Sequence, residues 1–129
     1  MANGNLVIGV PADPDAARAV LSCGRRLAQH LGLGWVAVLI RTPAASRSDA
    51  VRSVVELVVG LGGHLLCADA NDVAAGLIEV SRREQAPILV IGASRRPGIL
   101  RRLMRGTTER IVEARRPFDV VVARHGVER

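Results

Sequence analysis

The chain has 129 residues, 49% of them hydrophobic, and a formal net charge of +6. This length gives a single domain with a core large enough to need no disulfide or metal. Only one Trp, one Phe and no Tyr are present, which argues against binding of single-stranded nucleic acid through stacked bases and favours a Val, Leu, Ile and Ala core around a parallel sheet.

Five apolar, strand-length runs alternate with segments of helical period. The strands are predicted at residues 6–10, 35–40, 64–68, 87–93 and 119–123, and the helices at 14–31, 48–61, about 72–85 and about 108–115. This alternation requires crossover connections and therefore predicts an α/β fold, an open five-stranded parallel sheet flanked by helices. Residues 1–125 form this one domain, and residues 126–129 are a C-terminal tail.

The first predicted helix has the clearest boundaries. Asp13 is a suitable N-cap, Pro14 takes the first helical position and Gly32 ends the helix. Its apolar residues recur every three or four positions and predict a buried face that consists of Ala17, Val20, Leu21, Gly24, Leu27, Ala28 and Leu31. The second helix is predicted to bury a face of valines, namely Val51, Val54, Val55, Val58 and Val59.

Two turns stand out because each follows a predicted strand at its carboxyl end, where open parallel sheets bind ligands. The first covers residues 11–15 and the second residues 92–96, which Gly106-Thr107-Thr108 follows later in the chain. Free N–H groups, hydroxyls and guanidinium groups suit a phosphate. The candidate anion site therefore comprises Pro11, Ala12, Asp13, Gly92, Ser94, Arg95, Arg96, Gly106, Thr107 and Thr108. The alternative is an ordinary turn, with Asp13 and the threonines acting as helix caps.

The positive charge is concentrated in one region. Residues 95–116 hold eight Arg and two Glu, and the charges of the other residues cancel. On a helical wheel of residues 99–105, Arg101, Arg102 and Arg105 share a face opposite the apolar side chains. This face is a candidate docking surface for a protein partner or an anion. Plain solvation and binding to a membrane surface are the alternatives.

These turns resemble the nucleotide-binding motif of universal stress protein domains, and the resemblance spans essentially the whole chain. In that family a Gly-x-x-Gly turn after the fourth strand, followed by Gly-Ser or Gly-Thr, holds the phosphates and ribose of ATP. Gly92 matches the first glycine and Gly106-Thr107 the later pair, whereas Arg95 replaces the second glycine. The resemblance implies a Rossmann-like fold that binds ATP or another adenine nucleotide in a modified pocket, with Val38 among the contacts.

A narrower resemblance rests on Gly-x-Ser-Arg-Arg, the later Arg-Gly-Thr and the closing Phe-Asp-Val-Val-Val. This combination is similar to the universal-stress-protein-like domain in the sensor region of KdpD-type potassium-responsive histidine kinases. It implies a regulatory domain of a two-component system that docks protein partners or binds a cyclic dinucleotide. Relatives often pair through the last strand, which implies a homodimer with Val120, Val121 and Val122 at its edge.

The sequence offers little for catalysis. Ser22 has no base nearby by motif, no paired carboxylates suggest acid–base chemistry, and the three histidines lack the spacing of metal ligands. Cys23 and Cys67 are far apart and are expected to be small core or near-core residues rather than a disulfide. Without a signal peptide or a membrane-length apolar run, we expect a cytoplasmic, non-enzymatic protein with no metal site. The alternatives are a classical ATP-binding universal stress protein with weak or no ATPase activity, a nucleotide-hydrolysing enzyme of the same fold, and a nucleic-acid-binding protein that uses the Arg-rich region.

Overall fold

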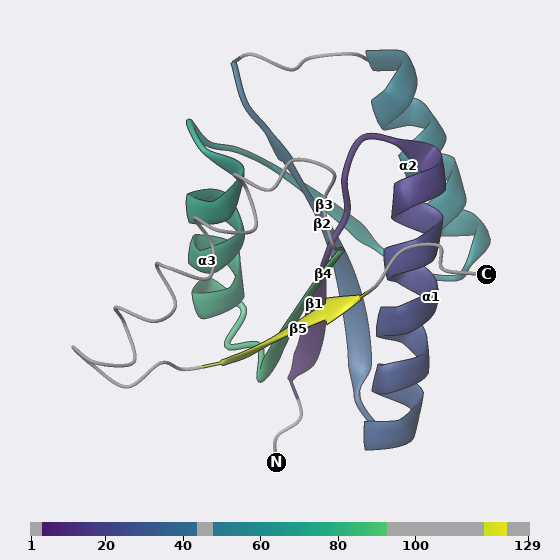
Figure 1. The fold of residues 1–129 in the computed structure, drawn as a ribbon, viewed down its shortest axis with the longest axis vertical. Helices are drawn as coiled ribbons and strands as arrows, with labels where there is room; N and C mark the ends of the chain where they lie inside the picture. The colour runs from purple at the N-terminus through teal and green to yellow at the C-terminus, as the bar shows by residue number, and fades with distance from the viewer. Residues whose placement is uncertain (1–3, 44–47, 93–117, 124–129) are drawn as a thin grey trace.

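The computed structural model describes residues 4–43, 48–92 and 118–123. Within these residues five strands and three helices follow one another along the chain (Figure 1). The strands are β1 (Asn5–Gly9), β2 (Gly34–Arg41), β3 (Leu65–Asp69), β4 (Ile88–Gly92) and β5 (Asp119–Ala123), and the helices are α1 (Pro14–Leu31), α2 (Ser48–Gly60) and α3 (Val73–Arg83). The helix expected at about 108–115 lies outside the described residues, as does the basic segment 99–105.

The five strands form one sheet in the order β3-β2-β1-β4-β5, and every neighbouring pair is parallel. The predicted open parallel α/β fold is therefore confirmed. β1 lies at the centre, with Val7 opposite Val36 of β2 on one side and Leu89 of β4 on the other. The chain adds β2 and β3 to one side of β1 and then crosses to add β4 and β5 to the other, so the strand order reverses between β1 and β4.

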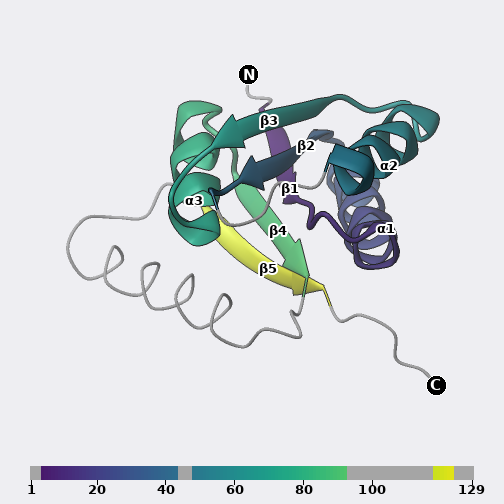
Figure 2. The same ribbon diagram turned by 90° about the horizontal axis from the view of Figure 1, so that it is seen from above.

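Helices cover both faces of the sheet. Figure 2 shows α1 and α2 on one face and α3 on the other. Successive residues of β1 alternate between the two layers, because side chains along a strand point to opposite faces: Leu6 and Ile8 pack with α1 and α2, and Val7 packs with α3. All three are fully buried. Burial on both faces explains why the strands are continuous apolar runs instead of alternating ones.

Each of the three described helices ends in a Schellman turn, in which two backbone bonds close the helix and one residue takes a positive φ. That residue is Gly32 after α1, Gly62 after α2 and Gln85 after α3, with φ angles of 69°, 81° and 55°. The expected helix ends at Gly32 and near Gln85 are confirmed. No helix in the described part of the chain is long and apolar enough to cross a lipid bilayer.

Three residues expected in or near the core lie at the surface. Leu31 is 50% exposed and Val59 is 62% exposed, and Cys67 is exposed as well. Leu31 belongs to the last turn of α1, and Cys67 lies on β3, an edge strand that has a neighbour on one side only among the described strands. Periodicity assigns these residues to an apolar face, but it does not show how far the neighbouring layer extends over that face.

Candidate functional site

The candidate site begins where β1 leaves the sheet. The Val10 amide still donates to the Val38 carbonyl at 2.9 Å, which continues the β1–β2 ladder one residue beyond β1. The next residue, Pro11, has no N–H and cannot extend the ladder. Pro11, Ala12 and Asp13 are all exposed. The turn therefore presents its side chains and backbone to solvent at the carboxyl end of the central strand.

The N-terminus of α1 opens at the same edge of the sheet. Asp13 has an extended backbone, and its Oδ2 accepts a hydrogen bond from the Ala16 amide at 3.2 Å. The Asp13 carbonyl accepts the first helical bond, from the Ala17 amide at 2.8 Å. Asp13 is thus the predicted N-cap, and Pro14 follows in the first turn. The partial positive charge of the helix end is directed toward the carboxyl ends of the strands, where it favours an anion.

Gly92 lies at the end of β4, which pairs with β1 on the side opposite β2. The strand order reverses between β1 and β4. Gly92 is half-buried, and a Cβ added to it would lie 3.7 Å from the Cβ of Val20 on α1. Since Val20 follows Asp13 by about two helical turns, the α1 helix links the β1 turn to the end of β4. The two strand ends that the sequence singled out therefore flank the point where open parallel sheets bind ligands.

The other predicted site residues divide into two groups. Val38 is fully buried, on the α3 side of β2, and only its carbonyl takes part in the β1 turn through the bond from Val10. Val120, Val121 and Val122 lie half-buried on β5, at the edge of the sheet. The remaining candidates lie outside the described residues: Ser94, Arg95, Arg96, Arg101, Arg102, Arg105, Gly106, Thr107 and Thr108.

An ion pair at the same edge was missed from the sequence. Arg41 Nε donates to Asp69 Oδ1 at 3.0 Å, and the two side chains are 48% and 76% exposed. Arg41 ends β2 and Asp69 ends β3, and they are register partners in the sheet. Such exposed pairs contribute about 0–1 kcal/mol to the free energy of unfolding. The main effect of this pair is therefore to hold the Arg41 guanidinium at the carboxyl edge of the sheet. Two oppositely charged residues directly after apolar strands were the available signal.

The described residues contain no group of three or more His, Cys, Asp or Glu side chains that could hold a metal ion. Chemistry at the described part of the edge therefore depends on backbone N–H groups, the Asp13 carboxylate and the Arg41 guanidinium. These groups can bind an anion or a sugar hydroxyl.

No protein-family model and no curated protein matches the sequence. Among solved structures, the chain is similar to a universal stress protein crystallised in complex with cAMP, with a TM-score of 0.59 and 17% sequence identity. The match covers 96% of this chain and 100% of the other. The chain has the universal stress protein fold. At this identity the likeness is one of fold, and it bears out the fold that the Gly92 and Gly106-Thr107 motif implied; the narrower resemblance to KdpD-type domains stays a prediction.

Proposed function

We propose that this chain is a non-catalytic regulatory domain that binds an adenine nucleotide or a cyclic dinucleotide at the carboxyl ends of β1 and β4. The observation that carries the proposal is the reversal of strand order between these two strands. The exposed Pro11–Asp13 turn lies on one side of the reversal and Gly92 on the other. The solved universal stress protein with the same fold was crystallised with a nucleotide, which supports this choice of ligand class.

The groups at the β1 turn match the phosphate and the ribose of a nucleotide. The N-terminus of α1 would attract a phosphate, and the Asp13 carboxylate can accept a hydrogen bond from a ribose hydroxyl while it caps the helix. Gly92 needs no Cβ for packing, because a methyl there would make only an ordinary contact with Val20. A glycine that packing does not require is consistent with close approach of a ligand to the backbone.

The test is a calorimetric titration of the purified chain with ATP, AMP, cAMP and a cyclic dinucleotide. At least one ligand should give heat that saturates below about 1 mM. Gly92→Ala should weaken that ligand at least about tenfold, because the added methyl narrows the approach of the ligand to the backbone at the end of β4. Gly60→Ala is the matched control: it adds the same methyl at the end of α2, where nothing lies within 4 Å, and should leave the affinity unchanged.

Two outcomes would refute the proposal. If none of the four nucleotides gives heat, the chain does not bind nucleotides. If Gly92→Ala and wild type bind with equal affinity, the ligand does not lie at the end of β4. Thermal unfolding of both variants checks that they fold. The non-catalytic part is tested separately by phosphate release from ATP, which should not exceed that of buffer. A steady rate that Gly92→Ala abolishes would establish a nucleotide-hydrolysing enzyme instead.

The regulatory part of the proposal rests on the KdpD-like residues 92–96 and on the Arg101, Arg102 and Arg105 face as a docking surface for a partner. Self-association through β5 is the second part. β5 has a strand neighbour on one side only among the described strands, and Val120–Val122 are half-buried. An edge strand of this kind supports pairing with a second copy, so the homodimer stays part of the proposed function.

A further inference from the structure

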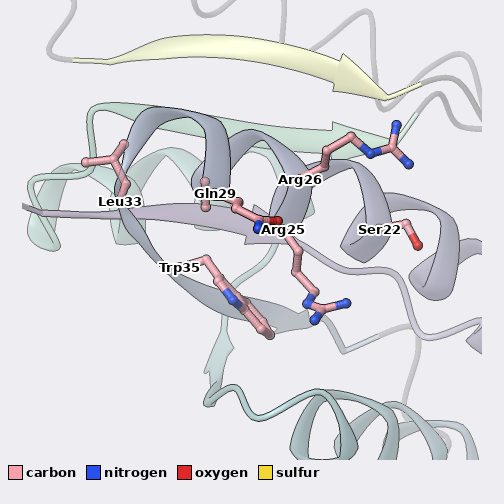
Figure 3. Close-up of a pocket in the computed structure, with 7 residues that line it drawn as sticks. Ser22, Arg25, Arg26, Gln29, Leu33 and Trp35 are labelled. Carbon is pink, nitrogen blue, oxygen red and sulfur yellow. The ribbon is translucent and has the colours of Figure 1, made fainter.

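A hollow of about 570 Å³ lies beside α1, near the amino end of β2. Its lining includes Ser22, Arg25, Arg26, Gln29, Leu33 and Trp35 (Figure 3). We propose that this hollow, called here the Arg25–Trp35 recess, binds a small aromatic anion. The aromatic ring lies against Trp35 and the anionic group pairs with Arg25. The recess is distinct from the nucleotide site proposed above, because it opens near the start of β2 and not at the carboxyl ends of β1 and β4.

The charge of the recess selects an anion. In the described part of the chain, no acidic side chain lines it. Among the described residues Arg18 pairs with Asp15 at 3.2 Å and Arg41 pairs with Asp69 at 3.0 Å, whereas no described carboxylate lies within 4.0 Å of Arg25. A guanidinium without a carboxylate partner among the described residues offers a forked pair of donors to a carboxylate or phosphate, and such charge-assisted hydrogen bonds are among the stronger ones.

The orientation of the side chains singles out Arg25. Figure 3 shows Arg25 and Trp35 extending to the same side of α1, while the neighbouring Arg26 extends to the other side. Gln29 follows Arg25 by four positions on the helix and so lies on the same stripe. Its amide can donate to a second oxygen of the same anionic group. The recess therefore has one guanidinium and one amide beside the indole.

The Trp35 indole is fixed by its contacts with the core and with the backbone at Gly63. It is half-buried and packs against the core layer of α1 and α2. A Cβ at Gly63 would overlap Cη2 of the indole, so the six-membered ring lies directly on the backbone after α2. A ring fixed in this way loses little conformational entropy when a ligand stacks on it, and this lowers the cost of binding.

The size of the recess favours an aromatic anion over a bare one. Its volume of about 570 Å³ falls in the range of about 300–1,000 Å³ that small-molecule sites occupy. An inorganic phosphate would fill little of this space and leave Trp35 and Leu33 uncovered. A ring with an attached phosphate or carboxylate uses both the polar and the apolar part of the lining.

The experiment uses the fact that Trp35 is the only Trp of the chain. Its indole N–H gives a single signal in a ¹H–¹⁵N correlation spectrum, which is followed during titration with phenyl phosphate. We expect a saturable shift with a Kd of about 1 mM. Inorganic phosphate and phenol carry the anion and the ring separately, and each should bind at least about tenfold more weakly than phenyl phosphate.

Arg25→Gln should weaken phenyl phosphate about fivefold or more, because it removes the charge–charge contact. Arg82→Gln is the matched control, with the same change of charge at an exposed position of α3 on the other face of the sheet, and should weaken it less than about twofold. Both positions are exposed, so neither variant is expected to unfold. Gly92→Ala should leave the shift unchanged, which separates this recess from the nucleotide site.

Three results would overturn the inference. A lack of any shift up to about 10 mM phenyl phosphate excludes binding. Equal affinity for inorganic phosphate or phenol excludes the combined ring-and-anion chemistry. Equal losses in Arg25→Gln and Arg82→Gln reduce the effect to the general positive charge of the protein.

Discussion

The β1–α1 and β3–α3 units are built alike at their junctions. Each is an apolar strand followed by a short turn and an Asp that caps the next helix. Asp13 Oδ2 accepts from the Ala16 amide at 3.2 Å, and Asp72 Oδ2 accepts from the Ala75 amide at 3.3 Å. Both caps have extended backbones. The units differ in their position in the sheet, since β1 lies between β2 and β4 whereas β3 pairs with β2 at the edge.

This difference shows which features follow from the local sequence and which follow from the order of the strands in the sheet. The same strand, cap and helix occur twice, yet only the first unit adjoins the point at which the order reverses. The end of β4 lies beside α1, because a Cβ added to Gly92 would be within contact distance of Val20. A capped helix N-terminus is therefore a general device of the fold, and its place next to a second strand end is what makes it a candidate ligand site.

The largest expected difference between the two units lies in how closely each helix packs on the sheet. α1 approaches β1 through Gly24, and α3 approaches β2 through Gly76. A Cβ at Gly24 would overlap Cδ1 of the fully buried Ile8, whereas a Cβ at Gly76 would lie 2.9 Å from the nearest atoms of Ile40, which is 8% exposed. Gly24→Ala should thus cost about 2 kcal/mol of unfolding free energy through overpacking, partly offset by helix propensity.

Gly76→Ala should cost at least about 1 kcal/mol less than Gly24→Ala, because the added methyl at Gly76 would lie 2.9–3.0 Å from Ile40 and Ala70, whereas the one at Gly24 would overlap Ile8 more deeply. Urea unfolding followed by circular dichroism measures both variants against wild type. An equal or larger loss in Gly76→Ala would show that α3 packs on the sheet as tightly as α1 does.

The next difference concerns the two caps. Asp13→Ala and Asp72→Ala should each destabilise the domain by at least about 1 kcal/mol, while Asp13→Asn should be nearly neutral, because Asn caps as well as Asp. Nucleotide affinity should fall in Asp13→Ala and stay at the wild-type value in Asp72→Ala. Thermal unfolding and the calorimetric titration measure the two effects. A parallel loss of affinity in both variants would place the ligand elsewhere.

The features that were predictable from the sequence are local ones. The Asp13 cap and the end of α1 at Gly32 follow from residues within one turn of each boundary, and the strands follow from short apolar runs. The features that were missed depend on residues far apart in the chain. Arg41 and Asp69 are 28 residues apart, and the contact of Trp35 with Gly63 depends on the pairing of β2 with β3.

The exposure of Cys67 was missed for the same reason, since it depends on β3 being an edge strand. The candidate site was accessible to prediction because its motifs directly follow strands. Its geometry required the strand order, which no local pattern contains.

The smallest expected effect compares the ends of the two helices. The turn after α1 has Gly32 at φ 69°, and the turn after α3 has Gln85 at φ 55°. Both turns make the same pair of bonds. The outer bond runs from the Leu33 amide to the Ala28 carbonyl at 2.9 Å in the first turn and from Ala86 to Ser81 at 3.0 Å in the second. The inner bond runs from Gly32 to Gln29 at 3.3 Å and from Gln85 to Arg82 at 3.0 Å. A side chain in this conformation is strained, and glycine is not.

Gln85→Gly should therefore stabilise the domain by about 0.5–1 kcal/mol, and Gly32→Ala should destabilise it by a similar amount. Opposite shifts of the urea midpoint with unchanged slope would confirm both. Destabilisation by Gln85→Gly would mean that the entropy that glycine adds to the unfolded chain outweighs the strain it relieves.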